Sequence, residues 1–148
     1  MTSAFARDNR GVMSDEHTAL IVVGYDGSAS ATRALDRAAG IAGPGGQVIV
    51  VSVCRSAGDA EGGAPAPRAD DPGALLEAAR LYLAGRVAVD LREATGDVAE
   101  ALASIAHEAG AGLIVVGAQG ADFVARTLLG SVAQRLIQRA PGDVLIVR

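Results

Sequence analysis

Lysine is absent from this sequence, and all 13 basic residues are arginine. A Walker A phosphate loop and Schiff-base catalysis both depend on a lysine amine, so the sequence excludes both. Cys54 is the only cysteine, which excludes an intrachain disulfide and a zinc site built from cysteines. A chain with a single thiol is typical of a reducing compartment, and we expect a cytoplasmic protein.

Aromatic residues make up only 3% of the chain, so exposed rings for stacking nucleic-acid bases are scarce. The net charge of −4 likewise disfavours a polyanionic partner. No apolar run approaches the roughly 18 residues of a membrane-spanning helix, and residues 1–17 lack the apolar core of a signal peptide. We therefore expect no nucleic-acid or membrane partner, and we interpret residues 1–17 as a flexible arm.

Half of the residues are hydrophobic, mainly Ala, Val, Leu and Ile, which suits β-branched strands covered by helices. Continuous apolar runs predict buried strands, and alternation at period two predicts an edge strand. The predicted strands are 19–24, 48–53, 86–93, 113–116 and 143–147. The predicted helices begin near Ser28 or Ser30, at Asp71-Pro72, at Asp97 and near Leu129. Residues 18–148 are thus expected to form one α/β domain with a doubly wound, five-stranded parallel sheet and a long mobile loop at 55–71.

A glycine-rich segment follows the apolar run 113–116 and extends from Gly117 to Ser131. Glycine lets backbone N–H groups approach phosphate oxygens, and a helix start offers unpaired N–H donors. Ligands of open α/β sheets bind where the winding direction reverses, so Asp26 shares one crevice with this segment if the first and fourth strands are neighbours. The combination predicts a nucleotide site. Spacing alone also allows a tight strand-to-helix turn, with Asp26 as a solvated turn residue or an Asx cap and Ser131 as a helix cap.

Several motifs together resemble the universal stress protein family, in its ATP-binding subclass. They are Ile-Val-Val-Gly-Tyr-Asp-Gly-Ser at 21–28, the Gly117-x2-Gly120-x9-Gly130-Ser131 spacing, and the closing Ala-Pro-Gly-Asp-Val-Leu-Ile-Val-Arg. The likeness covers residues 19–148. It implies a Rossmann-like sheet of the adenine-nucleotide α-hydrolase-like type with strand order 3-2-1-4-5. It also implies ATP across the ends of the first and fourth strands, and homodimers that pair through the last strand.

The resemblance also assigns roles to individual residues of this chain. Asp26 is expected on the ribose or adenine side, with the backbone near Gly24 and Val53 lining the adenine slot. The residues expected to contact ribose and phosphates are Gly117, Ala118, Gln119 and Gly120. Gly130, Ser131 and Val132 are expected to supply N–H and hydroxyl donors to the phosphates, with a divalent ion such as Mg²⁺ bridging. No protein ligand set for a metal is expected.

Two residues depart from the family pattern at the phosphate end of the expected site. Gln119 stands where many relatives have a basic residue or histidine, and Asp122 adds a negative charge that Arg126 offsets. A carboxylate near a phosphate opposes binding by about 1 kcal/mol when both are hydrated. AMP and cyclic AMP therefore stand beside ATP as candidate ligands.

Three functions follow from these expectations. The first is a nucleotide-dependent regulator or sensor in a stress response. The second is a weak ATP hydrolase, in which only Asp26 or Asp122 could serve as general base, because neither expected site loop contains histidine. The third is a dimeric interaction module without ligand.

Overall fold

The computed structural model describes residues 19–54, 71–118 and 130–148, and within them the chain alternates between strands and helices. The elements are β1 (Leu20–Gly24), α1 (Ala29–Ala42), β2 (Gln47–Cys54), α2 (Pro72–Leu83), β3 (Ala88–Thr95), α3 (Val98–Ala109), β4 (Leu113–Gly117), α4 (Ser131–Arg139) and β5 (Asp143–Val147). This order confirms the predicted α/β alternation. The expected arm at 1–17 and most of the expected loop at 55–71 lie outside the described residues.

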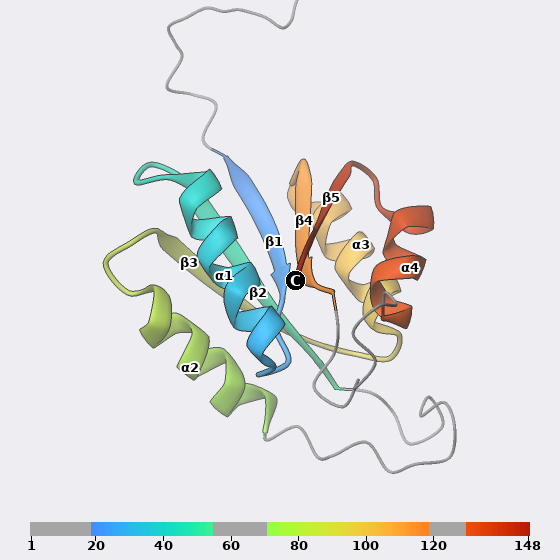
Figure 1. Ribbon diagram of the computed structural model, residues 1–148, viewed down its shortest axis with the longest axis horizontal. Helices are drawn as coiled ribbons and strands as arrows, with labels where there is room; N and C mark the ends of the chain where they lie inside the picture. Colours follow the sequence, from blue (N-terminus) through green and yellow to red (C-terminus); the bar gives the residue numbers. More distant parts are fainter. Residues whose placement is uncertain (1–18, 55–70, 119–129) are drawn as a thin grey trace, which may run out of the picture.

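The five strands form one parallel sheet in the order β3-β2-β1-β4-β5, as the family resemblance implied. Figure 1 shows α1 and α2 on one side of this sheet and α3 and α4 on the other. The chain winds outward from β1 to β3, crosses over through α3, and winds outward again from β4 to β5. The winding direction therefore reverses between β1 and β4.

Successive residues of the central strands enter two separate hydrophobic cores. On β1, Ile21 and Val23 pack toward α1 and α2, whereas Val22 packs toward α3 and α4. On β4, Val115 belongs to the first core and Ile114 to the second. Burial on both faces explains why these strands read as continuous apolar runs rather than as alternating patterns.

Side-chain caps start two of the helices where the sequence predicted them. The Oγ of Ser28 accepts a hydrogen bond from the N–H of Ala31 at 3.1 Å, and the Oδ1 of Asp97 accepts one from Glu100 at 2.8 Å. Of the two candidate caps of α1, Ser28 is the one used. Asp71 precedes α2 as predicted but makes no side-chain capping bond.

The observed ends of strands and helices differ from the predicted ones where the sequence pattern is weakest. The edge strand β3 begins at Ala88 and ends at Thr95, two residues later than the alternation suggested, because its register is fixed by pairing with all eight residues of β2. The last helix begins at Ser131 and ends at Arg139. Among the described helices, none combines the length and hydrophobicity that a membrane crossing requires.

Candidate functional site

The carboxyl ends of β1 and β4 lie side by side at the point where the winding reverses. The two strands pair in parallel, with Val22 opposite Ile114 and Val23 opposite Val115. Their final residues, Gly24 and Gly117, therefore reach the same edge of the sheet, at the bottom of Figure 1. Open α/β sheets bind ligands at such a reversal, so this edge is the candidate site.

The turn after β1 is held by backbone and side-chain hydrogen bonds. The N–H of Tyr25 continues the ladder by donating to Val51 at 2.9 Å, and the Oδ1 of Asp26 accepts from Ser28 at 2.9 Å. Gly27 has a φ of +84°, a conformation that side chains disfavour. Asp26 is thus an exposed turn residue that closes an Asx turn, while Ser28 rather than Asp26 caps α1. Its exposed position at the candidate edge is compatible with ligand contact as well.

Gly24 and Gly117 are both surrounded closely by neighbouring elements. A Cβ on Gly24 would come within 3.0 Å of Leu102 Cδ1, and a Cβ on Gly117 would come within 2.9 Å of the backbone nitrogen of Ala31. The sequence-based interpretation assigned Gly117 to ligand contact. The structure gives it a packing role, because it lets the first turn of α1 approach the end of β4.

Ala118 joins three parts of the site through its backbone. Its N–H donates to the carbonyl of Val147 at 2.7 Å, and its carbonyl accepts from the N–H of Gly130 at 2.8 Å. The second bond brings the start of α4 back beside the end of β4. It also occupies the N–H of Gly130, which was expected to face phosphate. The backbone N–H groups that remain available to a phosphate at the start of α4 therefore belong to the residues after Gly130.

The start of α4 has no side-chain cap. Gly130 occupies the N-cap position, so the alternative interpretation of Ser131 as the cap is wrong, and Ser131 is the first helical residue instead. The N–H of Gln134 makes the first intrahelical bond, to Gly130 at 3.1 Å. Helix geometry then leaves the N–H groups of residues 131–133 without intrahelical partners. Ser131 is exposed and Val132 half-buried.

The remaining predicted residues divide into placed and undescribed ones. Val53 lies near the carboxyl end of β2, which borders β1 at the candidate edge, and is half-buried. Gln119, Gly120, Asp122 and Arg126 lie outside the described residues. Within the part of the chain that is described, no group of three or more His, Cys, Asp or Glu side chains is arranged to hold a metal ion.

Sequence reasoning missed the contacts that hold α4 against α3. Arg135 pairs with Asp97, and Arg139 pairs with Glu100 at 3.4 Å. Arginines four residues apart on a helix share one face, but nothing local indicates which carboxylates they meet. The predicted cap at Asp97 was the one available signal.

Comparison with known proteins agrees with this architecture. The sequence pattern of the universal stress protein family matches residues 19–148. A universal stress protein of Mycobacterium tuberculosis strain H37Rv is 36% identical over 138 residues, which cover 86% of this chain and 94% of that protein.

Solved structures show the same likeness. A universal stress protein crystallised in complex with cAMP is 32% identical with a TM-score of 0.66, and the match covers 88% of this chain and 97% of that one. A family member from Burkholderia pseudomallei is 30% identical with a TM-score of 0.63, over 88% of this chain and 96% of that one. This chain belongs to the universal stress protein family.

Proposed function

We propose that this protein binds an adenine nucleotide across the carboxyl ends of β1 and β4 and acts as a nucleotide-dependent regulator or sensor in a stress response. One observation carries the proposal: the bond between Ala118 and Gly130 sets the uncapped start of α4 beside the reversal point of the sheet. The relative solved in complex with cAMP supports the same class of ligand.

Two parts of the edge suit the two halves of such a ligand. The adenosine half lies against the backbone near Gly24, the half-buried Val53 and the carboxylate of Asp26. The phosphate lies at the start of α4, where the N–H groups and hydroxyl of Ser131 and the N–H of Val132 donate to its oxygens. The positive end of the helix dipole favours an anion at this place. Gln119, Gly120 and Arg126 are proposed to complete the phosphate end.

The ligand is drawn from ATP, AMP and cyclic AMP. Because the described carboxylates do not gather into a metal site, Mg²⁺ in this proposal arrives with the nucleotide and is held through its phosphates. The cAMP complex of a 32%-identical relative makes cyclic AMP the first ligand to test.

A regulatory role fits the site better than hydrolysis. Asp26 is the described residue that could act as a general base, and its Oδ1 already accepts the N–H of Ser28. Proton transfer from an attacking water needs a carboxylate that is oriented toward it. Binding without rapid turnover is therefore the proposed behaviour.

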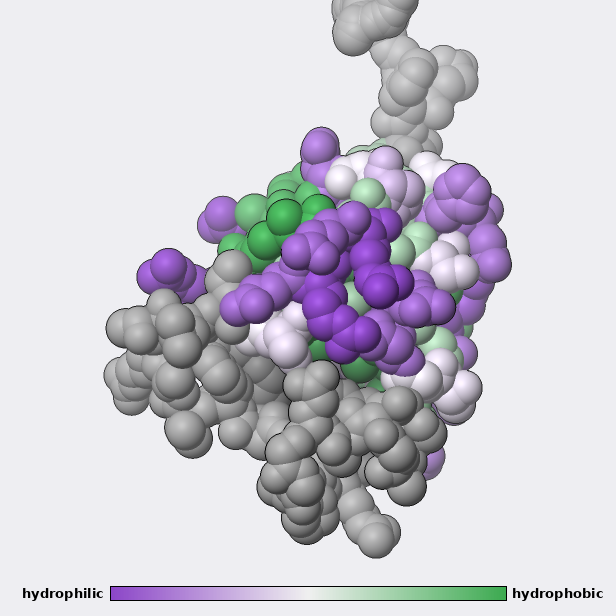
Figure 2. Space-filling model, turned by 90° about the vertical axis from the view of Figure 1, so that its right-hand side faces the viewer, coloured by the Kyte–Doolittle hydropathy of each residue, from purple (hydrophilic) through white to green (hydrophobic). Residues whose placement is uncertain are grey.

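We also propose that two copies of the chain pair through β5, the edge strand next to β4. Its residues 144–147 are apolar and only half-buried. Figure 2 looks onto the side of the molecule that carries α4 and β5, and it shows a hydrophobic area beside a polar band. Two-fold symmetry makes paired edge strands antiparallel, so Asp143 of one copy lies near Arg148 of the other.

The decisive experiment is to denature the purified protein and identify any nucleotide that it releases. Calorimetry with ATP, AMP and cyclic AMP, each with and without Mg²⁺, then ranks the ligands. Radiolabelled ATP distinguishes a sensor from a hydrolase. Absence of any bound or titratable adenine nucleotide would overturn the proposal.

A further inference from the structure

The helix that starts at the candidate phosphate end is thinly anchored. Two of the nine residues of α4, Ala133 and Leu136, are fully buried and Val132 packs against the same core, whereas α1 buries six of its fourteen residues. At its start, the backbone is tied to the sheet through the hydrogen bond from Gly130 to Ala118. Side-chain contacts on the polar face of α4 therefore help to fix how the helix is rotated and how far it lies along its own axis.

Two ion pairs join α4 to the start of α3, and the one formed by Arg135 is less exposed than the one formed by Arg139. Arg135 meets the Oδ2 of Asp97, and Arg139 meets Glu100 one helical turn further along. Asp97 and Glu100 occupy the N-cap and first turn of α3. Because α3 and α4 both begin at the carboxyl edge of the sheet, the pair at Arg135 is the one nearer to the candidate site.

Asp97 uses its two carboxylate oxygens for different tasks. Oδ1 caps α3 by accepting from the N–H of Glu100 at 2.8 Å, and Oδ2 pairs with Arg135. The cap fixes the orientation of the carboxylate, which is 25% exposed. Because the capping bond prevents this carboxylate from rotating freely, it holds Arg135, and with it α4, in one position.

We infer that the Asp97–Arg135 pair is a positioning device that sets the first turn of α4 for phosphate. This inference rests on the proposed nucleotide site. Neither residue touches the phosphate in this arrangement: Arg135 lies one turn beyond Ser131 on α4, and Asp97 holds it from α3.

A positioning role and a direct electrostatic role predict opposite changes in phosphate affinity when Asp97 is substituted. If the two charges acted on phosphate only through space, removing the negative charge of Asp97 would strengthen binding and removing the positive charge of Arg135 would weaken it. If the pair positions α4, both substitutions weaken binding. Asp97→Asn is the suitable variant, because asparagine still caps a helix and α3 is preserved.

The test measures calorimetric affinities for cyclic AMP and for adenosine, which lacks the phosphate. The proteins are the full chain and its Asp97→Asn, Arg135→Gln and double variants. We expect each single variant to bind cyclic AMP about threefold to fivefold more weakly, as suits a partly exposed pair, with adenosine affinity unchanged. The double variant should be no weaker than either single one, because the pair is broken in all three.

Arg139→Gln is the matched control, since it removes the same charge from the same helix one turn further from the site. It should leave the ratio of the two affinities unchanged. Hydrogen exchange at the amide of Gln134 gives a second readout, and it should speed up in Asp97→Asn and Arg135→Gln but not in Arg139→Gln.

The outcomes separate the two proposals. A wild-type protein that binds neither compound overturns the nucleotide site and the phosphate role of the pair together. A wild-type protein that binds cyclic AMP, with Asp97→Asn binding equally well or better, overturns the positioning role and leaves the nucleotide site standing.

Discussion

Gly117 at the end of β4 lies directly against Ser30 in the first turn of α1. A Cβ on Gly117 would lie 2.8 Å from the carbonyl carbon of Ser30, a distance that real Cβ atoms essentially never show. The hydroxyl oxygen of Ser30 lies closer still, but backbone atoms of Ser30 and Ala31 also stand within 3.0 Å, so moving a side chain alone would not make room. The lack of a side chain at position 117 is therefore required by the packing of the fold, whatever ligand the site holds.

Gly117→Ala is expected to destabilise the protein by about 1–3 kcal/mol, the usual cost of inserting a methyl group into a packed region. Denaturant unfolding of the ligand-free protein measures this change. Gly112→Ala is the control just before β4, because a Cβ there meets nothing within 4 Å, and it should shift stability by less than about 0.5 kcal/mol. Equal effects of the two substitutions would contradict the close approach of α1 and β4.

Asp26 can be tested for ligand contact separately from its role in the turn. Asp26→Asn keeps an oxygen that can accept the N–H of Ser28, whereas Asp26→Ala removes it. If the carboxylate binds the nucleotide, both variants should lose about tenfold in affinity, and only Asp26→Ala should also lose stability. Calorimetry and thermal unfolding on the same samples give the two values. Unchanged affinity in Asp26→Asn would remove the carboxylate from the proposed site.

Tyr82 should ionise at a higher pH than a free tyrosine. Its hydroxyl donates to both carboxylate oxygens of Asp36, at 3.0 and 2.9 Å, and this hydrogen bond is the main cause that raises the pKa of Tyr82 above 10.0. Burial and the negative charge of Asp36 raise it further, while Arg86 opposes the shift. A pKa that is higher in the folded state means that the bond stabilises the protein below pH 10 and is lost as the pH rises through the folded-state pKa.

Phenolate absorbance measures this shift once the other tyrosine is removed. In a Tyr25→Phe background, the titration midpoint of Tyr82 should fall toward 10.0 when Asp36→Asn is added. Arg86, which bonds Asp36 at 3.0 Å, remains in both proteins, so the difference isolates the carboxylate. A midpoint that Asp36→Asn leaves in place would show that the hydrogen bond between α1 and α2 does not form in solution.

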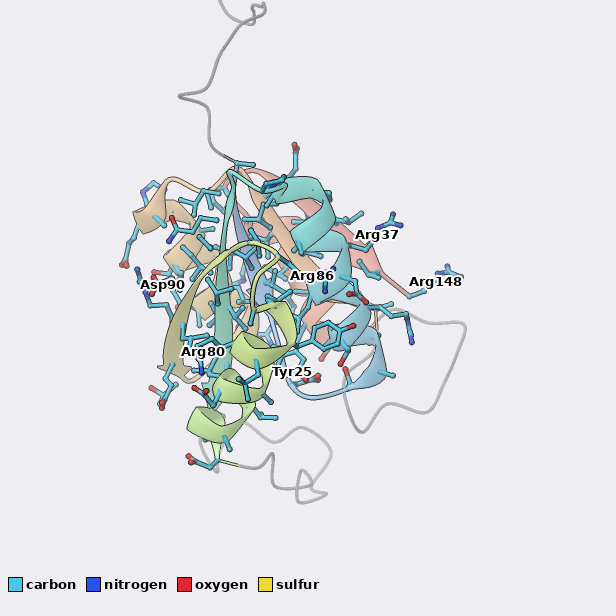
Figure 3. All side chains as sticks on the ribbon, turned by 90° about the vertical axis from the view of Figure 1, so that its left-hand side faces the viewer. Tyr25, Arg37, Arg80, Arg86, Asp90 and Arg148 are labelled. Atoms are coloured by element: carbon cyan, nitrogen blue, oxygen red, sulfur yellow. The ribbon has the colours of Figure 1, made fainter. Side chains whose placement is uncertain are left out.

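The proposed dimer makes a prediction about charge reversal at the two ends of β5. Figure 3 shows the side chain of Arg148 extending outward beyond α1, on the same side as Arg37. Asp143→Arg or Arg148→Asp places like charges opposite each other at both ends of an antiparallel pair, and we expect the dimer to weaken about tenfold. The double variant restores opposite charges and should regain most of the loss. Sedimentation analysis measures the dimer constants, and a double variant weaker than both single ones would contradict antiparallel pairing.

The sheet was predictable because its central strands are buried on both faces. A continuous apolar run such as 113–116 fits only a strand in the middle of the sheet, and a capping residue such as Asp97 marks where a helix begins. The bounds of β3 were less predictable, because alternation on an exposed edge strand tolerates a shift by two residues without changing which side faces water.

The sequence predicted where the candidate site lies in the fold, but not the contacts that build it. The neighbouring ends of β1 and β4 follow from the family resemblance, whereas three contacts depend on distant parts of the chain. Gly117 meets Ser30, Gly130 donates to Ala118, and Asp97 meets Arg135. A glycine motif signals that backbone approaches closely, but it does not say whether the approaching group is a phosphate or a helix.

The hydrogen bond between Gly130 and Ala118 also bears on how this protein can change over evolution. It holds together the two residues that flank positions 119–129, so the closure of that segment is fixed independently of its length. Lengthening a closed segment has a small entropic cost, about 0.6 kcal/mol for each doubling. We therefore expect insertions and deletions between Ala118 and Gly130 to leave β4 and α4 in place. If the proposed nucleotide binds at this edge, changes in this one segment can alter which ligand is preferred while the sheet and helices that support it stay the same.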